Sequence, residues 1–221
     1  MPSDARERAK ALSRQAVAAG DSSAWFEPLY QQADGNVDGV PWADDRPNPM
    51  LVDWLDSNPG DLGRILVVGC GLGEDAEALA PRATSIVAFD LSATAIEWCQ
   101  RRWPESRVEY VVADAANPPV TWRGSFDFVF ESYTLQALLD PQRSAVMRQL
   151  PRLLAADGRL LLQCRGRDDD ADVDGPPWPL SRNDLRPLEG DLTLDRFEDL
   201  HDPMEPEVRR FRVLYRRSSP A

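Results

Sequence analysis

Three glycines alternate with other residues in a short loop that follows an apolar run. The run is residues 64–68, Arg-Ile-Leu-Val-Val, and the glycines are Gly69, Gly71 and Gly73. Glycine permits a tight turn and a close approach of the backbone to a ligand, and the N–H groups at the start of a following helix favour a carboxylate or phosphate. A dinucleotide loop has the pattern G-x-G-x-x-G, but Glu74 follows Gly73 directly. The loop is therefore either a binding loop for another ligand or a purely structural turn.

Two aspartates support the ligand hypothesis. Asp90 ends the next apolar run, about twenty residues after the loop, where a carboxylate can accept hydrogen bonds from both ribose hydroxyls of an adenosine. Asp114 follows the third run, where it can accept a hydrogen bond from the exocyclic amine of adenine. Each aspartate alone is as consistent with a helix cap or an exposed loop. Because open α/β sheets bind ligands at the carboxyl ends of their strands, the three features in order favour a ligand site over a structural turn. The G-x-G-x-G pattern favours S-adenosylmethionine (SAM) over NAD as that ligand.

The elements that must position these residues follow a regular alternation. Short apolar runs alternate with helical patterns from about residue 64 onward, which predicts a parallel sheet covered by helices. Each of the first four strands has a crossover long enough for parallel pairing, whereas a short turn joins the last two, which must pair antiparallel. The expected strands are 64–68, 85–90, 108–112, 126–130, 159–164, 192–199 and 208–215. The expected helices are 4–19, 24–32, 50–55, 76–80, 93–103, 135–154 and 182–188.

Length and charge limit the classes of function. The chain has 221 residues, which suits one domain with residues 1–60 as an N-terminal helical lid extension and residues 61–221 as the core. Its formal net charge of -12 repels polyanions, so we expect a small-molecule substrate, with neither nucleic acid nor a membrane as partner. The sequence shows no leader pattern and no run of roughly 18 apolar residues, which favours a cytoplasmic protein, either a monomer or a weak homodimer.

Cysteine and histidine usage argues against several kinds of site. Cys70, Cys99 and Cys164 are far apart and lack C-x-x-C spacing, which indicates reduced thiols rather than a disulfide framework or a zinc site. His201 is the only histidine, so a histidine-based metal cluster or Ser-His-Asp triad is not expected, and we place His201 on the surface or at a strand end. The acidic loop 168–174 mimics the opening of a calcium loop, but the completing glutamate is missing. We expect no metal.

The two segments around the glycine loop and Asp90 resemble a known cofactor site. The stretch 65–75, Ile-Leu-Val-Val-Gly-Cys-Gly-Leu-Gly-Glu-Asp, and the stretch 87–92, Val-Ala-Phe-Asp-Leu-Ser, resemble class I SAM-dependent methyltransferases. Most members of that class have an acidic residue where this chain has Val67, and the thiopurine S-methyltransferase-like branch commonly lacks it. The segment 175–179, Gly-Pro-Pro-Trp-Pro, is similar to a segment of that branch. The chain departs from the branch at the position after Val67, where the branch often has proline.

The resemblance covers residues 24–215 and implies a Rossmann-like seven-stranded, mostly parallel sheet with an antiparallel last strand, helices on both faces and SAM as cofactor. Known substrates of the branch are thiols, halides and metalloid anions. The cofactor-binding residues that it implies are Trp42, Gly69, Cys70, Gly71, Asp75, Asp90, Leu91, Asp114, Ala115 and Glu131. Aromatic residues of the N-terminal region are similar to the aromatic lid of the branch, and the expected substrate-binding residues are Trp25, Tyr30, Trp42, Tyr133, Arg165 and Trp178.

The absence of a well-placed histidine suits a soft nucleophile. Displacement at a sulfonium depends mainly on alignment and desolvation, and a soft anion needs no base. An amine or hydroxyl would need a proton acceptor, and Glu131 and Tyr133, at the end of the fourth strand, are best placed as catalytic residues. A helix-capping role is equally consistent for Glu131. The leading hypothesis is SAM-dependent methylation of a small soft nucleophile; the alternatives are N- or O-methylation of a small metabolite and non-catalytic binding of SAM or a nucleotide.

Overall fold

A seven-stranded sheet forms the centre of the molecule. The computed structural model describes residues 2–203 and 205–217, and its strands lie in the order β3-β2-β1-β4-β5-β7-β6. The strands are β1 (Gly63–Val68), β2 (Ala83–Asp90), β3 (Glu109–Val112), β4 (Phe126–Ser132), β5 (Leu154–Arg165), β6 (Thr193–His201) and β7 (Arg209–Arg216). The pairings among β1 to β5 are parallel, and β7 runs antiparallel to both β5 and β6. The predicted mostly parallel sheet with an antiparallel last strand is confirmed.

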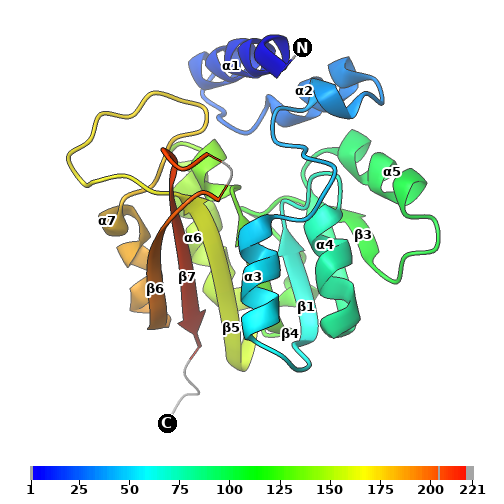
Figure 1. Cartoon of the computed structure of the whole chain (residues 1–221), viewed down its shortest axis with the longest axis vertical. Helices are drawn as coiled ribbons and strands as arrows, with labels where there is room; N and C mark the ends of the chain where they lie inside the picture. The colour runs from blue at the N-terminus through cyan, green and yellow to red at the C-terminus, as the bar shows by residue number, and fades with distance from the viewer. Residues whose placement is uncertain (1, 204, 218–221) are drawn as a thin grey trace.

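Helices cover both faces of this sheet (Figure 1). They are α1 (Pro2–Ala18), α2 (Phe26–Ala33), α3 (Pro49–Ser57), α4 (Glu74–Leu79), α5 (Ala93–Arg102), α6 (Gln142–Leu153) and α7 (Arg182–Leu185). Successive residues of β1 point to opposite faces: Ile65 and Val67 belong to a core cluster with residues of α3, α4 and α5, whereas Leu66 and Val68 belong to one with residues of α6 and α7. Burial on both faces explains why this strand reads as a continuous apolar run.

The first two helices lie across the edge of the sheet where the parallel strands end (Figure 1). The Glu27 carboxylate of α2 accepts hydrogen bonds from the hydroxyl groups of Ser92, at 2.5 Å, and Thr94, at 2.7 Å. Ser92 is itself the N-cap of α5, where its hydroxyl accepts from the Ala95 N–H. Glu27 therefore fastens α2 to the start of the helix that follows Asp90.

Two elements differ most from the sequence prediction in their bounds. The expected helix 135–154 is divided into a 3-10 turn, Leu135–Ala137, and α6, which begins directly after Pro141. The fifth strand begins at Leu154 rather than at residue 159, because its pairing register with β4 shifts between Phe126 and Phe128. Asp157 has a φ of 60° in this irregular stretch, so the Asp-Gly turn signal lies within a strand instead of before it.

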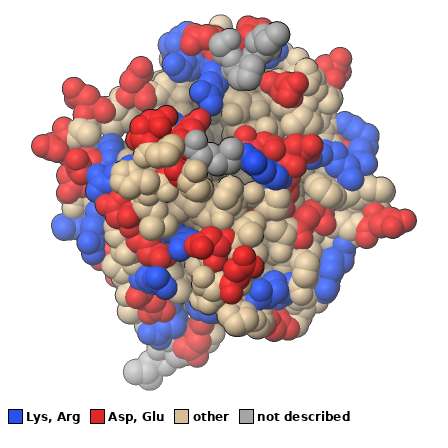
Figure 2. Space-filling view, in the orientation of Figure 1, with Lys and Arg blue, Asp and Glu red and all other residues tan. Residues whose placement is uncertain are grey.

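Acidic and basic side chains are intermixed on the face of the molecule that Figure 2 shows. The excess of Asp and Glu over Lys and Arg gives the chain its net charge of -12. Among the described residues, no helix is long and apolar enough to cross a membrane.

Candidate active site

A cavity of about 940 Å³ lies at the edge of the sheet where the parallel strands end, beneath α1 and α2. Its walls come from α1, α2, the segment before α3 and the loops after β1 to β5. The residues proposed from the sequence that line it are Trp25, Tyr30, Trp42, Gly69, Cys70, Gly71, Asp75, Asp90, Leu91, Asp114, Ala115, Tyr133 and Arg165. The structure therefore brings together nearly all of the predicted cofactor and substrate residues. The exceptions are Glu131 and Trp178, which are not among the lining residues.

The glycine loop and Asp90 form one hydrogen-bonded unit in the cavity wall. Gly69 and Gly71 have φ angles of 62° and 56°, a conformation that favours glycine. Asp90 Oδ2 accepts a hydrogen bond from the Gly71 N–H at 3.0 Å, and Oδ1 accepts from the Ser92 N–H at 2.9 Å. Burial raises the pKa of Asp90 to about 6, although these backbone hydrogen bonds oppose the shift. Each carboxylate oxygen has a second lone pair, so Asp90 can still accept hydrogen bonds from a ligand.

The third glycine has a different role. Gly73 is the N-cap of α4 with a φ of 93°, and a Cβ added there would lie 2.5 Å from the Tyr110 hydroxyl and 3.1 Å from Trp103 Nε1. A side chain at this position would collide with α5 and β3 neighbours rather than enter the cavity. Gly73 thus permits close packing. Gly69 does so as well, since a Cβ there would collide with the Thr134 side chain, but Gly69 and Gly71 also line the cavity and Gly73 does not.

The cavity wall next to Asp90 continues to the end of β3. Asp114 is exposed, and its Oδ1 accepts a hydrogen bond from the Ala116 N–H at 2.8 Å. Leu91 is 40% exposed although it is a large apolar residue. Leu91 and Asp114 therefore add an exposed apolar side chain and a hydrogen-bond acceptor to the same cavity wall as Asp90.

Asp75 connects the glycine loop with the segment that precedes α3. It lies in the first turn of α4, and its Oδ1 accepts a hydrogen bond from the Asn48 N–H at 2.7 Å. The Asn48 side chain caps α3 by accepting from the Met50 N–H at 2.9 Å. Burial raises the pKa of Asp75 to about 6. Asp75 therefore holds the N-terminal region against the loop from inside the cavity.

Four aromatic side chains form the upper wall of the cavity. Trp25 and Phe26 stack with ring centroids 4.4 Å apart, and Trp42 contacts Trp25, Phe26 and Tyr30 edge-on at 5.6 to 6.3 Å. Trp42 Nε1 donates a hydrogen bond to the Tyr30 hydroxyl at 3.1 Å. Trp25 and Tyr30 are buried, whereas Trp42 is 38% exposed. Trp42 is therefore the aromatic residue of this group that remains most accessible.

The assignment of Glu131 as a catalytic or cofactor-binding residue needs correction. Glu131 is fully buried, and its Oε1 accepts hydrogen bonds from the backbone N–H groups of Thr134, at 2.8 Å, and Leu135, at 3.0 Å. Burial raises its pKa to about 7. The carboxylate turns toward the backbone because the chain reverses at Tyr133, which has a φ of 66°. Glu131 thus caps the turn after β4 and does not contact the cavity.

Tyr133, unlike Glu131, faces the cavity and contacts an arginine that the sequence did not single out. The guanidinium of Arg210, on β7, lies 4.9 Å from the centre of the Tyr133 ring. Burial raises the pKa of Tyr133, and the Arg210 charge opposes this shift. Arg165, at the end of β5, lines the same region. We call the part of the cavity lined by these three residues its far end. It combines the phenol of Tyr133 with the guanidinium groups of Arg165 and Arg210.

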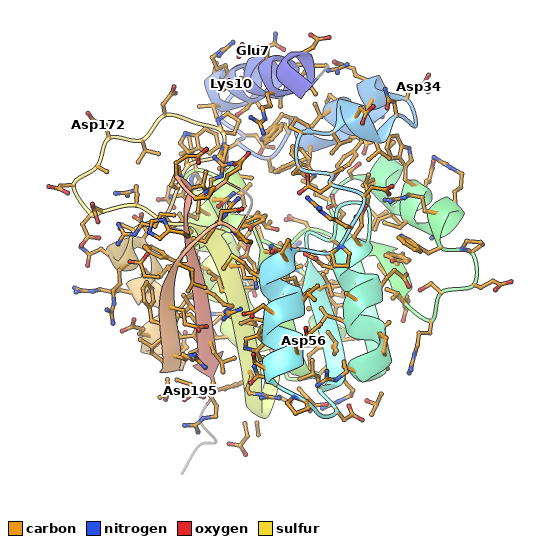
Figure 3. The ribbon with its side chains drawn as sticks, in the orientation of Figure 1. Glu7, Lys10, Asp34, Asp56, Asp172 and Asp195 are labelled. Atoms are coloured by element: carbon orange, nitrogen blue, oxygen red, sulfur yellow. The ribbon has the colours of Figure 1, made fainter. Side chains whose placement is uncertain are left out.

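The remaining sequence expectations concern Trp178, the cysteines, His201 and the acidic loop. The backbone N–H of Trp178 donates a hydrogen bond to the Gln136 carbonyl at 2.7 Å. The preceding residues, Pro176 and Pro177, line the cavity, but Trp178 does not. The three cysteines are free thiols, as predicted. His201 is exposed at the end of β6, also as predicted. Asp172 points outward from the acidic loop (Figure 3), and the described residues contain no group of His, Cys, Asp or Glu side chains suited to a metal ion.

Three residues that the sequence analysis missed hold this site together. Glu27, Asn48 and Arg210 act through contacts with residues far away in the chain. The pattern Asn48-Pro49 is a typical helix start, so the cap on α3 could be found from the sequence. Nothing local identifies the partners of Glu27 and Arg210, because these depend on how α2 and β7 are placed.

The chain is similar to known proteins over most of its core. Residues 65–158 match the family described as a methyltransferase domain. The chain is 32% identical to thiocyanate methyltransferase 1 of Brassica oleracea over 148 residues, which are 65% of this chain and 64% of that protein. It is 34% identical to a ubiquinone biosynthesis O-methyltransferase of Aromatoleum aromaticum over 136 residues, which are 60% of this chain and 52% of that protein. The chain thus spans less than two thirds of the length of these relatives.

A solved structure shares the fold. The N-methyltransferase NodS from Bradyrhizobium japonicum, determined with S-adenosyl-L-homocysteine, superimposes with a TM-score of 0.67 at 19% identity and covers 86% of this chain and 99% of that one. The similar proteins are named for transfer to a thiocyanate, to oxygen and to nitrogen. Fold similarity therefore does not identify the acceptor atom.

Proposed function

We propose that this chain is a class I SAM-dependent methyltransferase that transfers a methyl group from SAM to a small soft nucleophile such as a thiol. The observation that carries the proposal is the Gly71 to Asp90 hydrogen bond in the wall of a cavity large enough for cofactor and acceptor together. The similarity to a thiocyanate methyltransferase supports the choice of a soft acceptor.

The residues in the cavity wall fit the cofactor. A Cβ added at Gly71 would point toward the Tyr30 hydroxyl, at 3.4 Å, and Trp42 Nε1, at 3.8 Å, so glycine keeps this space open. Asp90 would accept hydrogen bonds from the ribose hydroxyls, Asp114 would face the adenine amine, and Leu91 would contact the adenine ring. When bound, SAM supplies a methyl group on a sulfonium, whose positive charge is lost as the methyl group leaves.

The residues around the reacting atoms would act by positioning and by excluding water. Trp25, Tyr30 and Trp42 form an apolar wall above the loop, where aromatic faces attract a cation and keep solvent out. Glu131 does not reach the cavity, so the carboxylate that we considered as a base is not in position. A soft anion needs no base, which favours this class of acceptor. An N- or O-methyltransferase would depend on Tyr133.

The N-terminal region would act as a lid on the same domain. We assign residues 1–60 to the lid and residues 61–221 to the core, because α1 and α2 cover the cavity and Glu27 and Asn48 join them to core residues. The free cysteines suit a reducing compartment such as the cytoplasm. The net charge of -12 supports a small-molecule acceptor rather than nucleic acid, and we propose a monomer or a weak homodimer.

Calorimetric titration with SAM, S-adenosylhomocysteine and NAD tests the cofactor assignment. We expect binding of the first two and none of NAD; binding of NAD without SAM would refute the proposal. Transfer of a labelled methyl group from SAM to thiophenol, iodide, thiocyanate and aniline then tests the acceptor. Preference for aniline would support the N-methyltransferase alternative, and SAM binding without transfer to any acceptor would support the non-catalytic one.

A further inference from the structure

The size of the cavity limits the acceptor, if the proposed function holds. A drug-sized ligand occupies a pocket of roughly 300 to 1,000 Å³, and SAM is a ligand of that kind. The cavity of about 940 Å³ lies at the upper end of that range, and its wall continues beyond the glycine loop and Asp90 to Arg165 and Arg210. A halide or thiocyanate ion would fill only a small part of that space. The part of the wall beyond the proposed cofactor residues is thus available to an acceptor with an organic body.

The walls at the far end of the cavity carry several arginines. Arg6 of α1, Arg165 of β5 and Arg210 of β7 line it, and they come from three elements that are distant in the sequence. Two carboxylates from the loop between β6 and β7, Asp202 and Glu205, face them. Within this group three cations meet two anions, whereas the rest of the cavity wall has more carboxylates than cations.

The three arginines differ in how firmly they are held. Arg210 is buried, and its Nε and Nη2 both lie within hydrogen-bond distance of Asp202 Oδ2, at 2.7 and 2.6 Å. Arg6 and Arg165 share Glu205, at 3.6 and 3.7 Å, which is too long for hydrogen bonds. Ion pairs of this length at partly exposed groups are weak. Glu205 is therefore a partner that an incoming anion can replace at small cost.

Arg165 is the donor that remains available for a ligand. Its side chain is 32% exposed, and it donates no side-chain hydrogen bond to any residue that the structure describes. Burial lowers its pKa, and the nearby positive charge of Arg210 lowers it further. A second anion beside Arg165 would offset this repulsion. The position therefore favours a bidentate contact with a carboxylate.

We infer that the acceptor is an organic thiol that carries a carboxylate, and that Arg165 binds this carboxylate as a specificity-determining residue, with Arg210 adding positive charge beside it. The thiolate sulfur forms the new bond to the methyl carbon while the bond from that carbon to the sulfonium breaks, and the electron pair stays on the departing sulfur. The thiol proton is released to solvent before transfer. Tyr133 holds the Arg210 guanidinium over its ring and so helps to shape this end of the cavity.

A matched pair of probes tests this inference. 4-Mercaptobenzoate and its neutral amide, 4-mercaptobenzamide, have nearly the same shape and differ in charge. We expect kcat/KM for the carboxylate to exceed that for the amide by roughly tenfold or more, the effect of one charge-assisted contact. Arg165→Gln should reduce this ratio to near one, because kcat/KM should fall about tenfold more for the carboxylate than for the amide. Arg196→Gln is the control, because Arg196 is an exposed arginine of β6 outside the cavity.

Direct binding keeps this test separate from the test of the proposed function. Calorimetric titration of the cofactor-free protein with 4-mercaptobenzoate should show binding that Arg165→Gln weakens about tenfold. An unchanged carboxylate preference in Arg165→Gln, or a preference for iodide or thiocyanate over both thiols, would overturn the inference. A weaker affinity for SAM in Arg165→Gln with unchanged thiol binding would also overturn it, because the arginine would then serve the cofactor carboxylate. Failure of SAM to bind, with the thiol contact intact, would instead refute the proposed function.

Discussion

The Asp90 carboxylate accepts the backbone N–H of Gly71 at 3.0 Å, across nineteen positions of sequence. This bond ties the end of β2 to the turn after β1, so that the loop and the carboxylate occupy fixed places in the same cavity wall. Asp90 is 8% exposed, so only a small part of its carboxylate is open to this cavity. A hydroxyl that fills this space gains more from the carboxylate than it would in water.

Replacing Asp90 with asparagine should weaken SAM binding by roughly a hundredfold. The amide oxygen can still accept from Gly71, but the two charge-assisted hydrogen bonds to the ribose are lost, at about 1.5–3 kcal/mol each. Isothermal titration calorimetry at pH 7.5 measures the change. Asp56→Asn is the control, since this residue lies on the opposite end of α3 from the cavity (Figure 3). An affinity within threefold of the native value would contradict the ribose assignment.

Gly71→Ala should impair SAM binding more than it impairs folding. The new Cβ would extend into the cavity toward Tyr30 and Trp42, and the φ of 56° would cost about 1–2 kcal/mol. Gly35→Ala is a matched control, because Gly35 also has a positive φ, of 80°, but a Cβ there meets nothing within 4 Å. Thermal unfolding should show similar destabilisation in both variants, whereas SAM affinity should fall by at least about tenfold in Gly71→Ala alone. Equal affinities would show that the loop does not contact the cofactor.

The sequence predicted the sheet and the residues that share the cavity wall because both depend on local pattern. Buried parallel strands read as apolar runs, and the ligand edge of such a sheet is fixed by strand direction. Glu131 shows the limit of that reasoning. Its place at the end of β4 was predicted, but the direction of its carboxylate depends on the chain reversal at Tyr133. Tyrosine is not a residue type that indicates such a reversal in a sequence. The partners of Glu27 and Arg210 could not be predicted from the sequence either, because these contacts depend on long-range packing.

Glu27→Ala should loosen the lid without disrupting the core. The carboxylate accepts from the hydroxyl groups of Ser92 and Thr94, and loss of these bonds should cost about 1–3 kcal/mol. Burial raises the pKa of Glu27, but the hydrogen bonds outweigh it and the net shift is downward. The contribution of Glu27 to stability is therefore fully present above its pKa in the unfolded chain, and it is lost as the pH falls through its lower pKa in the folded protein. Limited proteolysis should cleave within residues 1–60 faster than in the native protein.

The control for this prediction is Glu97→Ala. Glu97 lies on the exposed side of α5 and pairs with Arg101 at 3.7 Å, so it shares the helix but not the contact with α2. SAM affinity should fall in Glu27→Ala and stay unchanged in Glu97→Ala, as measured by calorimetry. Equal protease sensitivity in the two variants would contradict the role of Glu27 as the fastening of the lid.

Glu131→Gln separates a capping role from a catalytic one. The amide oxygen can keep both backbone hydrogen bonds, so the rate of methyl transfer should stay within about twofold, whereas loss of a general base would lower it roughly 10²–10⁴-fold.

Burial raises the pKa of Glu131 from 4.5 to about 7. An acid whose pKa is raised on folding contributes stability below its unfolded pKa and loses it as pH rises through the folded pKa. The native protein should therefore lose stability relative to Glu131→Gln between pH 5 and about 8. Denaturant unfolding across this range measures the difference in free energy of unfolding between the two proteins. A difference that does not change with pH would contradict titration of Glu131 in this range. A hundredfold loss of activity in Glu131→Gln would instead indicate that Glu131 acts as a base.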